Sequence, residues 1–354
     1  MSAPTIQSIA LAFPPYRLGA DEATARLSEV FVARGEDPAL VAQLVENSGI
    51  DGRALARPPA FYLTHTDLAS RNGAYVEVAR ELGEQAARAA LAEAGVAPEE
   101  IDLVIDTSCT GVMIPALDAH LTNVLGLRRD VRRLPLTEAG CAAGATSLAF
   151  ASDYLAARPQ GVALLVSVEL PSLTLQLEDT RRANLVSAAI FGDGAAAVVL
   201  ARRAPPRPSF EVLAHRATLF PNTEEIMGFD LGNTGFQIIL SRQIPLLVRR
   251  HLREEVDSFL EAQGLALSSV DFFVLHPGGT KVLDNVRDVL ELEEEDVAAA
   301  RASLREHGNL SSASIHAVAR RQLERGAIQP GRFGLLVAMG PGFTVELALL
   351  RGVA

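Results

Sequence analysis

Residues 91–111, LAEAGVAPEEIDLVIDTSCTG, follow the same pattern as residues 260–279, LEAQGLALSSVDFFVLHPGG. In each copy a helical pattern ends at a glycine and an aliphatic residue follows six positions later. An aspartate, Asp102 or Asp271, then precedes a run of apolar residues. Such a run is typical of a strand that helices cover on both faces of a mainly parallel sheet. The pattern therefore predicts an α/β chain of two similar halves that pack together as a layered, pseudo-duplicated fold.

A proline-rich segment, RRAPPRPS at residues 202–209, separates the two copies. It predicts a boundary between an N-terminal half, residues 1–205, and a C-terminal half, residues 206–354. The chain has 354 residues, of which 49% are hydrophobic and 21% charged, so it is long enough to bury one large core or two fused ones.

Net charge and cysteine content argue against several classes of protein. A formal net charge of -11 disfavours nucleic acid and anionic membranes as partners, because both would be repelled. The N-terminal segment is not a signal sequence, and no stretch reaches about 18 uninterrupted apolar residues, which predicts a cytoplasmic protein. The two cysteines, Cys109 and Cys141, cannot build a disulfide framework, and without CxxC or HExxH patterns no metal site is expected.

One cysteine lies in TEAGCAAGATSL, residues 137–148, between a short strand pattern and a helical pattern. Gly140 permits a tight turn, and the small residues after Cys141 allow a helix to begin close to neighbouring backbone. The helix dipole and free N–H groups at such a position favour the nucleophilic thiolate. The alternative is a small buried side chain at a turn, so the nucleophile hypothesis requires a base elsewhere.

Two further segments supply a candidate base and a candidate hydrogen-bond donor. His276, in FFVLHPGG, follows four apolar residues and precedes a Pro-Gly-Gly exit, so its imidazole emerges where the chain leaves a buried strand. Asn309, in HGNLSSAS, lies before a helix start made of small residues. It could cap that helix or donate its amide hydrogens to a developing oxyanion, and the residues alone leave both roles open.

The segments TEAGCAAGATSL, FGDGAAAVVL, FFVLHPGG, HGNLSSAS and MGPGFTVE occur in this order along the chain. In order and approximate spacing, the whole chain resembles the type III polyketide synthases, the chalcone-synthase-like group of the thiolase superfamily. Residues 66–91, TDLASRNGAYVEVARELGEQAARAAL, are most similar to its bacterial alkylresorcinol and alkylpyrone synthases. The resemblance implies a homodimer with the five-layered αβαβα thiolase fold, whose two halves are the repeated units.

The resemblance also assigns chemical roles. Cys141 matches the nucleophile that carries the starter and the growing chain as a thioester. His276 and Asn309 match the pair that binds the thioester carbonyl of malonyl-CoA and stabilises the enolate formed on decarboxylation, and His276 also maintains the thiolate. Because decarboxylation of a malonyl thioester needs only donors at the enolate oxygen, no metal and no cofactor besides the CoA substrates is expected.

Other positions match the family's substrate cavity and its entrance. Phe191 and Phe236 match the phenylalanines between the CoA tunnel and the cavity, with ordinary core packing as the alternative. Ile114 matches a residue that reaches into the partner subunit's cavity. The remaining matched positions are Cys109, Thr174, Met227, Lys281 and the loop formed by Gly340, Pro341 and Gly342.

The expected binding of CoA departs from the plant pattern. Plant members carry basic residues for the CoA phosphates at the positions of residues 40–47, where this chain has none. Arg53, Arg57 and Lys281, the chain's only lysine, are candidates to replace them, with solvated surface positions as the alternative.

The expected activity is iterative condensation of malonyl-CoA onto a medium- or long-chain fatty acyl starter, followed by cyclisation to an alkylpyrone or alkylresorcinol. The similarity of residues 66–91 and the aliphatic Ile114 and Met227 motivate this starter. Delivery by CoA or an acyl carrier protein, the number of extensions, and lactone or aldol closure stay open. Two alternatives are a ketoacyl-carrier-protein synthase III, which condenses once, and a catalytically silent protein of the same fold that binds acyl chains.

Overall fold

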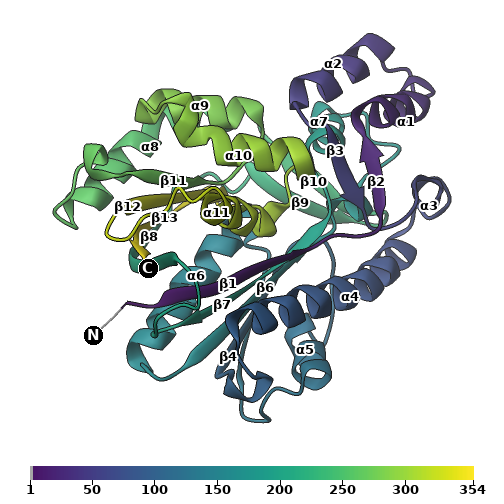
Figure 1. Ribbon diagram of the computed structural model, residues 1–354. Coiled ribbons are helices and arrows are strands. Elements are labelled where there is room, and N and C mark those ends of the chain that lie inside the picture. Colours follow the sequence, from purple (N-terminus) through teal and green to yellow (C-terminus); the bar gives the residue numbers. More distant parts are fainter. Residues whose placement is uncertain (1–2) are drawn as a thin grey trace.

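A mixed sheet of nine strands connects the two halves of the chain in the computed structural model, which describes residues 3–354 (Figure 1). The strand order is β11-β12-β13-β8-β1-β7-β6-β4-β5, so strands of the two halves occupy opposite sides. The N-terminal side contains β1 (Thr5–Ala12), β4 (Leu103–Ser108), β5 (Arg132–Thr137), β6 (Val162–Glu169) and β7 (Gly194–Ala201). The C-terminal side contains β8 (Ser209–Leu219), β11 (Phe272–Leu275), β12 (Phe333–Gly340) and β13 (Thr344–Val353).

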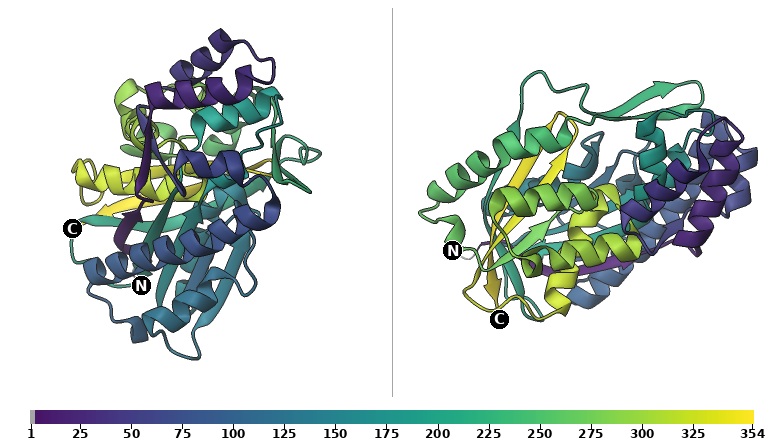
Figure 2. Two further views of the ribbon diagram at one scale, coloured as in Figure 1. Left: turned by 90° about the vertical axis from the view of Figure 1, so that its right-hand side faces the viewer. Right: turned by 90° about the horizontal axis from the view of Figure 1, so that it is seen from above.

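Helices cover both faces of each side of the sheet and produce five layers (Figures 1 and 2). One outer layer consists of α4 (Leu68–Ala94) and α5 (Leu117–Leu125). The other consists of α8 (Ile244–Glu261), α9 (Thr280–Leu290) and α10 (Glu294–His307). Two helices, α6 (Ala143–Ala157) and α11 (Ser314–Glu324), form the middle layer, because each contacts strands from both halves. The predicted αβαβα thiolase fold is therefore confirmed.

The two repeated segments fold alike. Asp102 and Asp271 each lie directly before a strand, β4 or β11, and hold the start of the neighbouring parallel strand. The Asp102 N–H donates to the Val162 carbonyl at 2.8 Å, and its carboxylate accepts from the Val162 N–H at 2.9 Å. Asp271 makes the same two bonds to Phe333, at 2.7 and 3.0 Å. This shared bonding supports the internal duplication.

The strand directions differ from the prediction of a mainly parallel sheet. Among the strands of residues 3–354, only β4 with β5, β4 with β6, and β11 with β12 are parallel pairs. The pairs β6–β7, β7–β1, β12–β13 and β13–β8 are antiparallel. Strands such as β7 are apolar along their whole length because helices cover both faces, and this burial resembles that of a parallel strand. The pattern of buried residues in a strand therefore did not show whether that strand pairs in the parallel or the antiparallel direction.

Smaller elements surround one end of the layered body (Figure 1). They are the paired strands β2 (Tyr16–Gly19) and β3 (Gly52–Leu55), the hairpin β9 (Met227–Gly232) and β10 (Gly235–Leu240), and the helices α1 (Ala20–Val32), α2 (Pro38–Ser48), α3 (Pro59–Thr64) and α7 (Arg182–Ile190). Residues 202–208 join β7 to β8, and the division of the chain at residue 205 stays a prediction. Within residues 3–354, no helix is long and apolar enough to span a membrane.

Candidate active site

The nucleophile corner is a one-turn 3-10 helix, Gly140–Ala142, between β5 and α6. Gly140 has φ of +55°, a left-handed conformation that glycine adopts readily. A Cβ at this position would also lie 2.5 Å from Cδ of Pro341. The loop between β12 and β13 therefore packs directly on the corner that presents Cys141.

The Cys141 thiol is buried, with 8% of the residue exposed. Its Sγ lies 3.5 Å from the Ser311 hydroxyl oxygen, to which it donates a hydrogen bond. Burial raises the pKa of Cys141 to about 12, while the side chains of Ser311 and Asn309 act in the opposite direction. Burial thus favours the thiol in the free protein, and the formation of a thiolate at this corner stays a prediction that requires a nearby base.

His276 lies directly after β11, where its backbone N–H donates to the Val337 carbonyl at 2.9 Å. The residue is 4% exposed, and burial lowers the pKa of its imidazole to about 4. Nδ1 is buried and has no hydrogen-bond partner among residues 3–354. The imidazole is neutral at pH 7, so it can take up a proton when a thiolate forms nearby.

The Asn309 side chain serves the first of the two roles that the sequence left open, the cap, and the oxyanion role stays a prediction. Its Oδ1 accepts from the Ser311 N–H at 2.8 Å and from the Ser314 hydroxyl at 3.2 Å. This carboxamide oxygen therefore holds the turn that leads into α11. The Nδ2 group lies 3.5 Å from the Gly278 carbonyl, so capping by the oxygen directs the donor toward the loop that follows His276.

These three side chains line one cavity of about 980 Å³. They come from three segments that are far apart in the sequence, and the fold brings them to a single volume. Other predicted residues that line this cavity are Phe191, Phe236, Cys109, Thr174, Met227, Lys281 and Pro341. Gly340 and Gly342 flank Pro341 without lining the cavity, and Ile114 lies outside it with 91% of the residue exposed.

A buried carboxyl group beside the cavity was not found by the sequence reasoning. Glu169, at the end of β6, is 0% exposed and accepts hydrogen bonds from the Ser312 hydroxyl at 2.6 Å and the Thr110 hydroxyl at 3.0 Å. Cys109 Sγ lies 3.6 Å from one Glu169 oxygen and 3.6 Å from the Ser311 hydroxyl. Burial raises the pKa of Glu169. A glutamate at the end of a strand pattern that is apolar except for Ser167 was the signal that could have identified it.

The cations at the cavity differ from the expected set. Arg53 is buried and donates to the carbonyls of Ala188 and Phe191, at 2.7 and 3.2 Å. Arg57 pairs with Glu77. Both arginines are therefore engaged in the fold. Lys281, from the expected set, lines the cavity together with Arg182 and Arg242, which the sequence reasoning did not propose. None of these three forms an ion pair within the described part of the chain.

Within residues 3–354, no group of three His, Cys, Asp or Glu side chains is placed to hold a metal ion. The donors at the cavity are a thiol, a neutral imidazole, a carboxamide and hydroxyl groups. This set can carry an acyl group as a thioester and stabilise negative charge on a thioester oxygen.

Comparisons with known proteins agree with this chemistry. The profile of the N-terminal domain of chalcone and stilbene synthases matches residues 55–204, and that of the C-terminal domain matches residues 211–354. A 1,3,6,8-tetrahydroxynaphthalene synthase of Streptomyces peucetius is 40% identical, over 98% of this chain and 93% of the relative. A phloroglucinol synthase of Pseudomonas fluorescens is 34% identical, over 88% of each chain.

A solved structure gives the same result. The 1,3,6,8-tetrahydroxynaphthalene synthase of Streptomyces coelicolor, described as a bacterial type III polyketide synthase, superimposes with a TM-score of 0.94 and 30% identity. The match covers 99% of both chains. The chain belongs to the chalcone and stilbene synthase family and is a type III polyketide synthase.

Proposed function

We propose that the enzyme condenses malonyl-CoA repeatedly onto an acyl starter held on Cys141. The observation that carries this proposal is the convergence of Cys141, His276 and Asn309 on one cavity. His276 first accepts the thiol proton of Cys141, and the resulting imidazolium and thiolate stabilise each other, which offsets the burial that disfavours either charge alone. The thiolate attacks the carbonyl of the starter thioester, the C–S bond to CoA breaks, and CoA leaves as a thiol with the proton from His276.

Extension begins when malonyl-CoA loses CO2 and leaves an enolate on its thioester. His276 and the Asn309 amide donate hydrogen bonds to the enolate oxygen, where the negative charge accumulates. The enolate carbon attacks the acyl carbonyl, a C–C bond forms, and the C–S bond to Cys141 breaks. The product is a thioester of CoA that is two carbons longer, and its return to the Cys141 sulfur allows the next extension.

Three cations at the cavity suit the phosphates of CoA. Arg182, Arg242 and Lys281 lack ion-pair partners within residues 3–354, whereas most other cations of this acidic chain are paired. We therefore expect Arg242→Glu to raise the KM for malonyl-CoA about tenfold, the value of one charge-assisted contact, and the effect to shrink with added salt. Steady-state kinetics measure this change.

The matched control is Arg250→Glu, because Arg250 is also exposed and without an ion pair in the described part of the chain but lies on α8, outside the cavity lining. An equal KM for malonyl-CoA in wild type and Arg242→Glu would show that Arg242 does not bind the CoA phosphates.

The proposed starter is a medium- or long-chain fatty acyl group, and cyclisation gives an alkylpyrone or alkylresorcinol. The catalytic cavity supports this starter, because aliphatic side chains including Met227, Ile238 and Leu240 line it. We also propose a homodimer in which Ile114 enters the partner subunit's cavity. Its exposure of 91% leaves the side chain free for such a contact. A second candidate product is a hydroxylated ring without an alkyl chain, which the names of the relatives favour.

A competition assay decides between these products. Acetyl-, hexanoyl-, dodecanoyl- and coumaroyl-CoA are mixed in one tube with limiting malonyl-CoA, and products are identified by mass. We expect dodecanoyl-derived products with several extensions to dominate, since each buried methylene contributes about 0.8 kcal/mol. Ile114→Phe should move the preference to shorter chains. Dominance of a product from malonyl-CoA alone would establish the second candidate, and a single extension would indicate a synthase III-like activity.

A further inference from the structure

One carboxylate lines the catalytic cavity without a partner. Among the described residues that line this cavity, Glu138 is the only acidic one. The residue is exposed, and its carboxylate forms neither an ion pair nor a hydrogen bond within residues 3–354. The steps of acyl transfer and extension that involve Cys141, His276 and Asn309 do not use this carboxylate.

Glu138 lies beside the nucleophile. The parallel strands β4 and β5 end as a pair, at Ser108 and Thr137. The residues that follow these strands, Cys109 and Glu138, both line the cavity. Cys141 comes three positions after Glu138, at the corner between β5 and α6. An acyl chain on the Cys141 sulfur therefore begins within one turn of backbone from this carboxylate.

The backbone at Glu138 is in the left-handed region, with φ of +69°. Residues other than glycine rarely adopt this conformation, and such residues are concentrated at functional sites. Within residues 3–354, the other non-glycine residues with positive φ are Asn222, Glu291 and Ser311. Glycine would form the same turn with less strain, so the turn does not account for a glutamate at this position. A role of the side chain in the cavity accounts for it.

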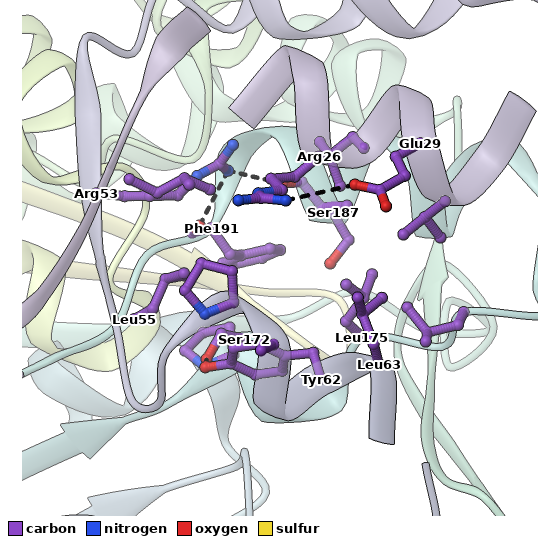
Figure 3. A pocket seen from close by; sticks show the side chains of 18 residues that line it. Arg26, Glu29, Arg53, Leu55, Tyr62, Leu63, Ser172, Leu175, Ser187 and Phe191 are labelled. Atoms are coloured by element: carbon purple, nitrogen blue, oxygen red, sulfur yellow. Dashed lines mark hydrogen bonds and ion pairs between the residues drawn. The ribbon is translucent and has the colours of Figure 1, made fainter. Parts of the chain in front are cut away.

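A neighbouring pocket contains a carboxylate that is paired (Figure 3). This pocket, of about 180 Å³, shares Phe191 with the catalytic cavity, and Glu29 is the only acidic residue among its described lining residues. Glu29 pairs with Arg26 on the same helix, α1, at 3.4 Å. Within the described part of the chain, none of the cations that line the catalytic cavity pairs with Glu138 in this way. Its carboxylate is therefore available to accept a proton from a substrate.

We propose that Glu138 is the general base of ring closure. The inference rests on the proposed function, because it requires a chain that is extended on Cys141 and then cyclised. A methylene group between two carbonyls of that chain gives its proton to the Glu138 carboxylate. The electron pair of the C–H bond stays on the chain, which becomes an enolate.

The enolate attacks a second carbonyl of the same chain. Attack through carbon forms a C–C bond, and the attacked oxygen takes the proton from Glu138. Attack through oxygen at the thioester carbonyl forms a C–O bond and breaks the C–S bond, and the sulfur takes the proton. Glu138 is a carboxylate again after either closure, and no oxidant or additional reactant is consumed.

Glu138→Gln tests the proposal directly, because the amide keeps the size of the side chain and is not a base. Enzyme is mixed with dodecanoyl-CoA and malonyl-CoA, or with malonyl-CoA alone, and the first turnover is stopped with acid at set times. Released CO2 measures extension, and mass spectrometry measures ring product and open chains. We expect CO2 release to stay within about twofold of wild type and ring formation to slow by about a hundredfold, the lower end of what a general base contributes. Open chains should accumulate.

Three further variants separate the base from the turn. Glu138→Asp keeps a carboxylate and is expected to restore part of the rate of ring formation. Glu138→Gly keeps the left-handed turn without a base, so it should lose ring formation at an unchanged or higher Tm. Glu291→Gln is the matched control, since Glu291 is also an exposed glutamate with positive φ, +54°, but lies at the end of α9, outside the cavity lining.

Ring formation at the wild-type rate in Glu138→Gln would overturn the inference, because a different group would then accept the proton. A parallel loss of CO2 release would also overturn it, since the carboxylate would then act in extension. If wild type released only open chains, the enzyme would have no closure step, and extension on Cys141 would still stand. Absence of any extended product from wild type would instead reject the proposed function itself.

Discussion

Cys141→Ala is expected to abolish chain extension while malonyl-CoA decarboxylation stays measurable. Extension requires an acyl–sulfur bond at this position, and loss of a covalent nucleophile reduces turnover by roughly ten-thousandfold or more. Decarboxylation needs only the donors at the enolate oxygen, and His276 and Asn309 remain in place. Incubation with radiolabelled malonyl-CoA measures released CO2 and extended product in the same sample.

The control for this variant is Ser152→Ala. Ser152 lies on α6, the helix that follows Cys141, is 6% exposed, and bonds the Leu148 carbonyl at 2.7 Å. Like Cys141→Ala, the Ser152→Ala variant loses a single heavy atom at a buried position. A loss of activity in Ser152→Ala would therefore report general damage to the helix. Extension that survives in Cys141→Ala at more than a few per cent would show that the chain is carried by a different group.

Asn309 and His276 variants are expected to lose decarboxylation. Removal of one oxyanion donor typically costs about a hundredfold to a thousandfold in kcat, and each residue supplies one donor in the proposed mechanism. Asn309→Asp separates donor from cap, because the carboxylate still accepts from the Ser311 N–H and the Ser314 hydroxyl but has no amide hydrogens. We expect Asn309→Asp to lose decarboxylation as Asn309→Ala does while keeping a higher Tm.

Calorimetry and the labelled assay measure these two properties. Full decarboxylation by Asn309→Asp would show that Asn309 serves the fold alone.

The pH dependence of decarboxylation gives a second check on His276. Because burial lowers its pKa to about 4, the imidazole is neutral above that pH and gains its proton only below it. A neutral donor therefore persists from pH 8 down to about pH 5, and decarboxylation in the free enzyme should stay constant over that range.

Local sequence patterns predicted the elements of the fold because short-range preferences determine them. Gly95 and Gly264 have positive φ and lie just after α4 and α8, and Asp102 and Asp271 directly precede the equivalent strands β4 and β11. Strand direction could not be predicted from local patterns. It depends on how the chain connects one strand to the next, either through the tight loop at Pro341 or through long connections.

The candidate site was likewise predictable in part from local sequence patterns. The Cys141 corner, the strand exit at His276 and the helix start at Asn309 are local patterns, so the sequence alone was sufficient to nominate all three. The protonation preference of Cys141 depends on desolvation and on Ser311, 170 residues away, and no local pattern contains that information. Only the tertiary structure could decide it.

The sequence also did not predict all of the cationic side chains that line the cavity. Arg53 and Arg57 are near the expected segment, yet one bonds the carbonyls of Ala188 and Phe191 and the other pairs with Glu77. Arg182 and Arg242 are distant in sequence and line the cavity. The residue types and local turns were determined by the sequence itself. Which charges are compensated, and which side chains share a cavity, depends on contacts between remote segments, so only the tertiary structure decided them.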